Sequence, residues 1–95
     1  MKNLILILCL TCLPLLSSAQ SVKIEGKIIS AEDKEPLIGA TVKVKGTTIS
    51  AISDIDGNYI ITADANATLV FSYISFQSME ELIKGRNKID VTLSP

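Results

Sequence analysis

The chain has no histidine and no tryptophan, and its only cysteines, Cys9 and Cys12, lie close to the N-terminus. Histidine and cysteine are the usual zinc ligands, and histidine is the commonest general base. Their absence from the rest of the chain argues against a zinc enzyme and against stabilisation by disulfides. We therefore expect a protein that is not an enzyme, with no catalytic residues, no cofactor and no metal.

An excess of charge of either sign is also lacking. Nine lysine and arginine residues stand against ten aspartate and glutamate residues, and without Lys2 the formal net charge of the remainder is 8 − 10 = −2. No lysine–arginine cluster with interleaved aromatic residues is present, which argues against nucleic-acid binding. For the same reason we expect no binding to anionic lipid.

Residues 1–19 have the pattern of a secretory signal peptide. Lys2 provides the positive charge, residues 4–16 form the apolar run, and the small residues Ser17 and Ala19 occupy the cleavage positions. The run is too short to span a bilayer comfortably, and no stop-transfer segment follows. We expect cleavage before Gln20, which would remove both cysteines and leave residues 20–95 as one domain; an uncleaved N-terminal anchor is the alternative.

After residue 20, apolar and polar side chains alternate in short segments separated by turn residues. A period of two indicates half-buried strands. The segments that we predict as strands are 22–28, 37–45, 47–53, 58–63, 68–76, 78–84 and 88–93. Segment 78–84 keeps a helical alternative, because its apolar residues are also at helical spacing. Seven short strands with regularly spaced turns predict a small all-β sandwich.

The segment 68–76 is the strongest strand prediction and the predicted centre of the core. Its apolar side chains occupy both faces, with Leu69, Phe71 and Tyr73 on one and Val70, Ile74 and Phe76 on the other. A strand that is apolar on both faces is usually central and covered on both sides.

An acidic turn at residues 54–58 invites a calcium interpretation. Asp54, Asp56 and Asn58 resemble the start of an EF-hand loop, but the twelfth position, which needs a bidentate glutamate, is Ala65. Aspartate, asparagine and glycine also form turns without any metal. We favour the turn.

Two further groups suggest chemistry on first inspection. Gly39 and Gly46 fit no glycine-rich phosphate motif, so we interpret them as punctuation between strands. The adjacent Glu80 and Glu81 would need a cleft and convergent geometry to act as a catalytic pair. We expect them on a solvated face.

The aromatic residues and one sequon complete the candidates. A sugar-stacking platform is conceivable, but core packing is the favoured interpretation for the four aromatic residues Tyr59, Phe71, Tyr73 and Phe76. The triplet 66–68 fits the N-glycosylation sequon, which has meaning only where a glycosylation system is present.

Several segments together resemble the carboxypeptidase regulatory-like domain. The resemblance spans 22–93, and its most specific pieces are the turn and strand at 35–42 and the acidic turn at 53–59. Further matches are Gly26, the step at 45–48 and the apolar strand at 69–74. Two positions depart from the family pattern: Ser75 stands where glycine is usual before the aromatic residue, and Asp33-Lys34 replaces the usual threonine-glycine.

This resemblance implies an immunoglobulin/prealbumin-like β-sandwich of the kind often found at the N-terminus of SusC/RagA-type TonB-dependent outer-membrane receptors. It implies an exported, periplasmic interaction module of a Gram-negative, Bacteroidetes-like bacterium, associated with the outer membrane. Its partner would be a receptor plug or barrel, or another protein of the periplasm, and after signal cleavage it would not span the membrane.

Two alternatives remain for the function: an accessory domain of a metallocarboxypeptidase, and a free carbohydrate-binding sandwich. The plug and barrel that follow this domain in such receptors are not among the 95 residues. Both a stand-alone domain and the leading fragment of an interrupted receptor therefore stay open as interpretations.

Overall fold

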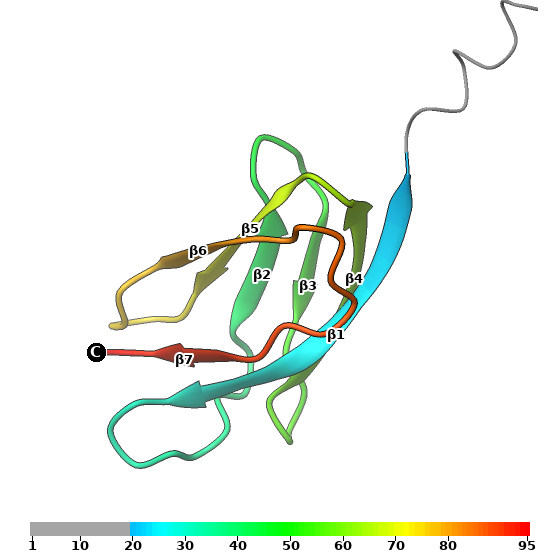
Figure 1. The fold of residues 1–95 in the computed structure, drawn as a ribbon. Coiled ribbons are helices and arrows are strands. Elements are labelled where there is room, and N and C mark those ends of the chain that lie inside the picture. Colours follow the sequence, from blue (N-terminus) through cyan, green and yellow to red (C-terminus); the bar gives the residue numbers. More distant parts are fainter. Residues whose placement is uncertain (1–19) are drawn as a thin grey trace, which may run out of the picture.

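The computed structural model describes residues 20–95, which form two packed β-sheets (Figure 1). The strands are β1 (Ser21–Ser30), β2 (Thr41–Val44), β3 (Ser50–Ile52), β4 (Asn58–Asp64), β5 (Thr68–Ser72), β6 (Met79–Leu82) and β7 (Val91–Leu93). One sheet has the order β4-β1-β7 and the other the order β3-β2-β5-β6. The predicted seven-stranded all-β sandwich is confirmed, whereas the predicted signal peptide lies outside the described residues.

The long strand β1 organises the first sheet. Its N-terminal part runs antiparallel to β4, from Ser21 opposite Asp64 to Lys27 opposite Asn58. Its C-terminal part runs parallel to β7, with Ile28 opposite Val91. Because side chains alternate along a strand, this one segment turns every second residue into the core.

The second sheet is antiparallel throughout. Val42 of β2 lies between Ala51 of β3 and Phe71 of β5, and Phe71 in turn lies opposite Met79 of β6. The rings of Tyr59 and Phe71, which come from different sheets, meet edge to face with their centroids 5.5 Å apart. This contact joins the two layers at the middle of the sandwich.

The core is made of aliphatic side chains around the Tyr59–Phe71 pair. Its buried members are Ile24, Ile28, Leu37, Ala40, Val42, Val44, Tyr59, Ile61, Ala63, Leu69, Phe71, Ile83, Ile89, Val91 and Leu93. These residues form one hydrophobic core cluster within residues 20–95. Within that part, no helix is long and apolar enough to cross a membrane.

The strand predicted at 37–45 is shorter in the structure, because the backbone turns before Thr41. Gly39 has a φ of 81°, which is incompatible with extended strand geometry. The Ser53 hydroxyl donates to the carbonyl of Leu37 (2.6 Å) and accepts from the amide of Ala40 (2.8 Å). The buried Ser53 side chain thus adds to the backbone bonds here, in which the Gly39 amide donates to the Ser53 carbonyl (3.0 Å) and the Ser53 amide to the Ala40 carbonyl (2.9 Å).

The strand predicted at 68–76 also ends early, and the prediction that both of its faces are covered is wrong. The Phe76 amide donates to the Tyr73 carbonyl (3.0 Å), which closes a turn after β5. Ile74 is 81% exposed in that turn. Each sheet of a two-layer sandwich has only one covered face, and the covered face of β5 carries Leu69 and Phe71.

The remaining differences concern the type of segment 78–84 and the bounds of two strands. The helical alternative for 78–84 is wrong, since β6 pairs with β5 there. The strands predicted at 47–53 and 88–93 are reduced to β3 and β7.

We predict that Phe71→Ala lowers the free energy of unfolding by about 3–5 kcal/mol, the usual range for a fully buried phenylalanine. A domain of this size without disulfides has about 3–5 kcal/mol in total, so the variant should be largely unfolded. The control is Lys43→Ala on the exposed face of β2, for which a change below about 0.5 kcal/mol is expected. Urea melts measure both, and a parent-like melt of Phe71→Ala would contradict the assignment of the core.

The two departures from the family pattern coincide with strained backbone. Lys34 has a φ of 64° and Ser75 a φ of 68°, a region that favours glycine. We predict that Lys34→Gly and Ser75→Gly each raise the free energy of unfolding by about 0.5–1 kcal/mol, because relief of strain exceeds the entropic cost of glycine. Lys43→Gly, within β2, should instead lower it by about 0.5–1 kcal/mol. Thermal melts in which all three variants lose stability would contradict the explanation.

Candidate functional site

The best-defined polar arrangement lies where β1 meets the chain that leads into β7. Pairing begins regularly, since the Glu25 amide donates to the Asn87 carbonyl (3.1 Å) and the Ile89 amide donates to the Glu25 carbonyl (3.0 Å). At the next rung, the Lys27 amide donates to the Asp90 side chain (Oδ1, 2.9 Å). A carboxylate therefore occupies the place of a ladder carbonyl.

The carbonyl of Ile89 is turned into the sandwich instead. It accepts a hydrogen bond of 2.6 Å from the buried Tyr59 hydroxyl. A Cβ at Gly26 would lie 1.9 Å from this oxygen and 3.1 Å from the Tyr59 ring. Only glycine at position 26 leaves room for the carbonyl, which explains the glycine within an otherwise apolar strand face.

Burial raises the pKa of Tyr59 well above its ordinary value. The negative charge of Asp90 raises this pKa further, while the positive charge of Arg86 opposes the rise. The phenol is therefore held in its neutral form, in which it donates to the Ile89 carbonyl. This is a structural tyrosine and not an acid or base poised for catalysis at neutral pH.

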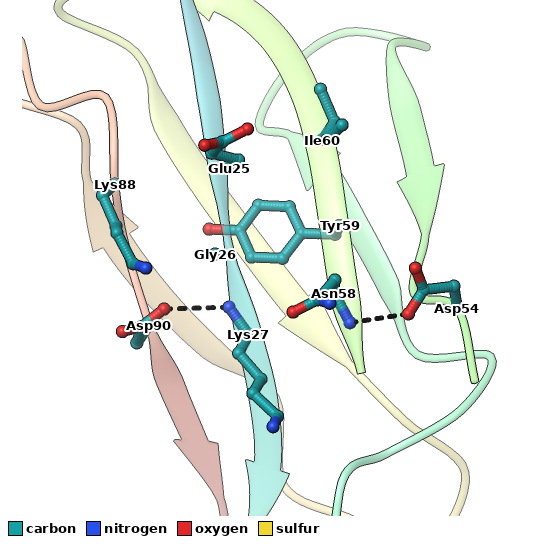
Figure 2. A pocket seen from close by; sticks show the side chains of 9 residues that line it. All are labelled: Glu25, Gly26, Lys27, Asp54, Asn58, Tyr59, Ile60, Lys88 and Asp90. Atoms are coloured by element: carbon teal, nitrogen blue, oxygen red, sulfur yellow. Dashed lines mark hydrogen bonds between the residues drawn. The ribbon is translucent and has the colours of Figure 1, made fainter. Parts of the chain in front are cut away.

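The outer surface of the same sheet carries a shallow hollow of about 470 Å³ (Figure 2). Its charged side chains come from β1, from the β3–β4 turn and from the segment before β7: Glu25, Lys27, Asp54, Lys88 and Asp90. Ile60 is the apolar part of the lining. Both signs of charge alternate on an open surface, which can hold polar groups but offers no nucleophile and no sheltered base.

The acidic turn is capped by its own side chain. Asp54 Oδ1 accepts from the amides of Asp56 and Asn58, both at 2.9 Å. Gly57 has a φ of 78°, and a Cβ there would lie 2.7 Å from the Ile28 carbonyl oxygen. No group of three or more metal-ligating side chains gathers anywhere in residues 20–95.

The aromatic residues fall into two pairs. Tyr59 and Phe71 are buried in the core, as the favoured interpretation predicted, and are unavailable for sugar stacking. Tyr73 and Phe76 are half-buried in the turn after β5, with their rings edge to face at 5.3 Å. The prediction that Tyr73 and Phe76 lie on opposite faces of one strand is wrong, because β5 ends before them and both belong to this turn.

The two glutamates of β6 do not converge. Glu80 pairs with Lys45 at 3.1 Å, and Glu81 pairs with Arg86 at 3.2 Å. Asn66 is exposed in the turn between β4 and β5, where its amide donates to Asp64 Oδ1 (2.8 Å). The structure thus gathers none of the sequence candidates into a catalytic arrangement within the part of the chain that it describes.

Comparison with known proteins gives the family. The CarboxypepD_reg-like domain matches residues 24–95, and the chain belongs to this family. TonB-dependent receptor P3 of Formosa agariphila is 40% identical over 76 residues, which cover 79% of this chain and 8% of the receptor. TonB-dependent receptor SusC of Bacteroides thetaiotaomicron is 42% identical over 62 residues, covering 65% of this chain and 6% of the receptor. The chain therefore corresponds to less than a tenth of the length of these relatives.

Solved structures agree on the fold. A chain in a type II cohesin–X–dockerin complex from Acetivibrio cellulolyticus superposes with a TM-score of 0.61 at 19% identity, covering 76% of this chain and 56% of that one. A second mutant of that complex gives a TM-score of 0.56 at 22% identity, covering 75% and 52%. At this identity the likeness shows the fold alone.

We predict that Tyr59→Phe lowers the free energy of unfolding by about 1–3 kcal/mol, because the buried carbonyl of Ile89 loses its donor. The parent should also lose stability above about pH 10, since a tyrosine whose pKa is raised by folding favours the unfolded state once the unfolded phenol ionises. Below that pH this contribution is fully present. Urea melts from pH 7 to 11 should show a smaller alkaline loss for Tyr59→Phe; equal losses would contradict the assignment.

We predict no calcium-dependent rise in the melting temperature of residues 20–95, because Asp54 already accepts two backbone hydrogen bonds. A metal that binds only the folded state at a hundredfold excess over its Kd would add about 2.7 kcal/mol of stability. Asp54→Ala should lower the melting temperature equally with and without calcium. A rise with calcium in the parent that Asp54→Ala abolishes would overturn this interpretation.

Proposed function

We propose that the chain is a non-enzymatic, exported interaction module related to the N-terminal domain of SusC/RagA-like TonB-dependent nutrient receptors. It acts on the periplasmic side of the outer membrane, where it docks to a receptor or to a neighbouring protein of the cell envelope. The supporting observation is the match of residues 24–95 to one domain family, together with about 40% identity to segments of receptors that are far longer.

The surface supports a docking role. The outer face of the first sheet is open, and its hollow around Lys27 and Asp90 carries charges of both signs without a buried chemical centre. Edge strands of a sandwich can also accept an additional strand from a partner. Binding through such surfaces requires no cofactor.

The arrangement of the polar residues favours binding over catalysis. The buried polar side chain of Ser53 and the buried hydroxyl of Tyr59 are both committed to backbone partners. Each glutamate of β6 has a cationic partner. These four polar side chains are thus engaged in holding the fold.

Expression of the tagged full chain in a Gram-negative host that makes TonB-dependent receptors tests this proposal. We expect a processed protein that begins at Gln20, fractionates with the periplasm or the outer membrane, and cross-links to a receptor. The control lacks residues 4–16 and should remain in the cytoplasm without that cross-link. An uncleaved protein in the inner membrane, or a processed protein that cross-links to no envelope protein, would contradict the proposal.

A further inference from the structure

Two sheets leave four edge strands, which are β4 and β7 in one sheet and β3 and β6 in the other. An edge strand exposes unpaired amides and carbonyls that can pair with another chain. Natural proteins protect such edges with charge, short length or covering segments. The four edges of this sandwich differ in how far they are protected.

β6 and β7 are protected. β6 carries Glu80 and Glu81, both in ion pairs, and the Arg86 guanidinium also donates to the Leu82 carbonyl. β7 has only three residues, and the Ser94 carbonyl just beyond it accepts from the Gln77 amide (2.8 Å). Neither edge offers a long uncharged ladder.

The edge strand β3 also has only three residues, whereas β4 has seven residues at an edge. The Ile28 amide donates to the Gly57 carbonyl and the Ala65 amide to the Gln20 carbonyl, so the odd-numbered residues of β4 direct their backbone groups to β1. Ile60 and Thr62 consequently direct theirs outward. Among residues 20–95, no turn or loop hydrogen bond reaches either of them.

The side chains along this edge are not protective. Ile60 is 56% exposed, Thr62 is exposed and uncharged, and no proline or lysine occurs in β4. The hydrogen bonds that tie β3 to β4 are confined to the turn, where the Asp54 amide donates to the Asn58 carbonyl (2.9 Å). β3 itself belongs to the other sheet.

We propose that β4 is a self-association edge, at which two copies of this chain pair antiparallel about a two-fold axis through Ile61. The product is one six-stranded sheet that runs continuously through both sandwiches. In this register, Ile60 of one copy faces Thr62 of the other, so all four outward backbone groups of each copy gain partners. An isologous contact of this kind closes at two copies.

The end residues of β4 select this register. An axis through Ile61 places Asn58 opposite Asp64 of the second copy, and Lys27, which neighbours Asn58 on β1, adds a positive charge on the same face. An axis through Ile60 would oppose Asp56 to Asp64, which is a like-charge pair. An axis through Thr62 would oppose Ile60 to Asp64. Of these three axes, only the Ile61 axis places a neutral polar residue opposite Asp64, with a lysine on the next strand, and also uses the whole strand.

The contact is one strand pair, so it buries less than the roughly 1,000 Å² of a stable interface. We therefore expect weak, concentration-dependent association of residues 20–95, which include the whole family domain at 24–95. Sedimentation equilibrium up to about 1 mM should show the apparent mass rising from one chain toward two. Ile60→Lys should abolish the rise, because it places a charge at the edge. Ile74→Lys, at an 81% exposed position in the turn after β5, should leave the rise unchanged.

Disulfide cross-linking tests the register directly. Because residues 20–95 contain no cysteine, only the introduced cysteines can form a disulfide. A mixture of Ile60→Cys and Thr62→Cys should cross-link under oxidation to a heterodimer, in clear excess over the homodimer of either variant alone. Circular dichroism verifies that every variant is folded. Equal yields in the three samples, or a parent that stays monomeric throughout, would overturn the proposal. A monomer whose β4 edge instead captures an extended peptide, with loss of capture in Ile60→Lys, would assign the edge to another polypeptide.

Discussion

The hydrogen bond from the Tyr59 hydroxyl to the Ile89 carbonyl ties the first sheet together, from its edge strand β4 to the segment that leads into β7. Tyr59 belongs to β4, Ile89 precedes β7, and Gly26 of β1 lies between them, so this bond crosses the whole first sheet. The ring of Tyr59 also packs against Phe71 of the second sheet. One side chain thus connects three strands of one layer to the core of the other, in a small domain that has no disulfide to help it.

This central bond also determines what the outer surface presents. Because the Ile89 carbonyl points inward, the amide of Lys27 takes Asp90 as its partner, and Asp90 becomes part of the charged hollow. The buried side chains of Tyr59 and Ser53 therefore serve the structure, while the hollow on the outer surface of the first sheet is charged, shallow and open. Such a division suits the docking role proposed above, and the receptors to which the chain is similar match it over less than a tenth of their length.

Much of the fold was predictable from period-two alternation. The inward positions of β1 and the burial of Phe71 follow from the order of apolar and polar residues, and the turn after Asp54 follows from its aspartate, asparagine and glycine. The ends of β2 and β5 were not predictable in this way, because a local backbone φ at Gly39 and a turn after Tyr73 override the side-chain pattern. The family resemblance was confirmed, and it drew attention to Lys34 and Ser75, whose strain only the backbone reveals.

The Tyr59–Ile89 bond was missed for a different reason. It joins residues thirty positions apart through a carbonyl, and a carbonyl leaves no mark in the sequence. The one available signal was Gly26, a glycine on an apolar strand face, since such a glycine often marks the close approach of another backbone. The position of β4 at a sheet edge was likewise not predictable. It depends on the order of the strands within the sheet, and the periodicity of apolar residues does not give that order.

The most direct test of this account is the stability of Gly26→Ala. The added methyl group must displace the Ile89 carbonyl, which a Cβ would otherwise approach to 1.9 Å. We expect the free energy of unfolding in urea to fall by about 1–3 kcal/mol, and the fall to be smaller when Tyr59 is already phenylalanine, because both changes break the same bond. A Gly26→Ala protein as stable as the parent would show that the inward carbonyl of Ile89 does not stabilise the first sheet.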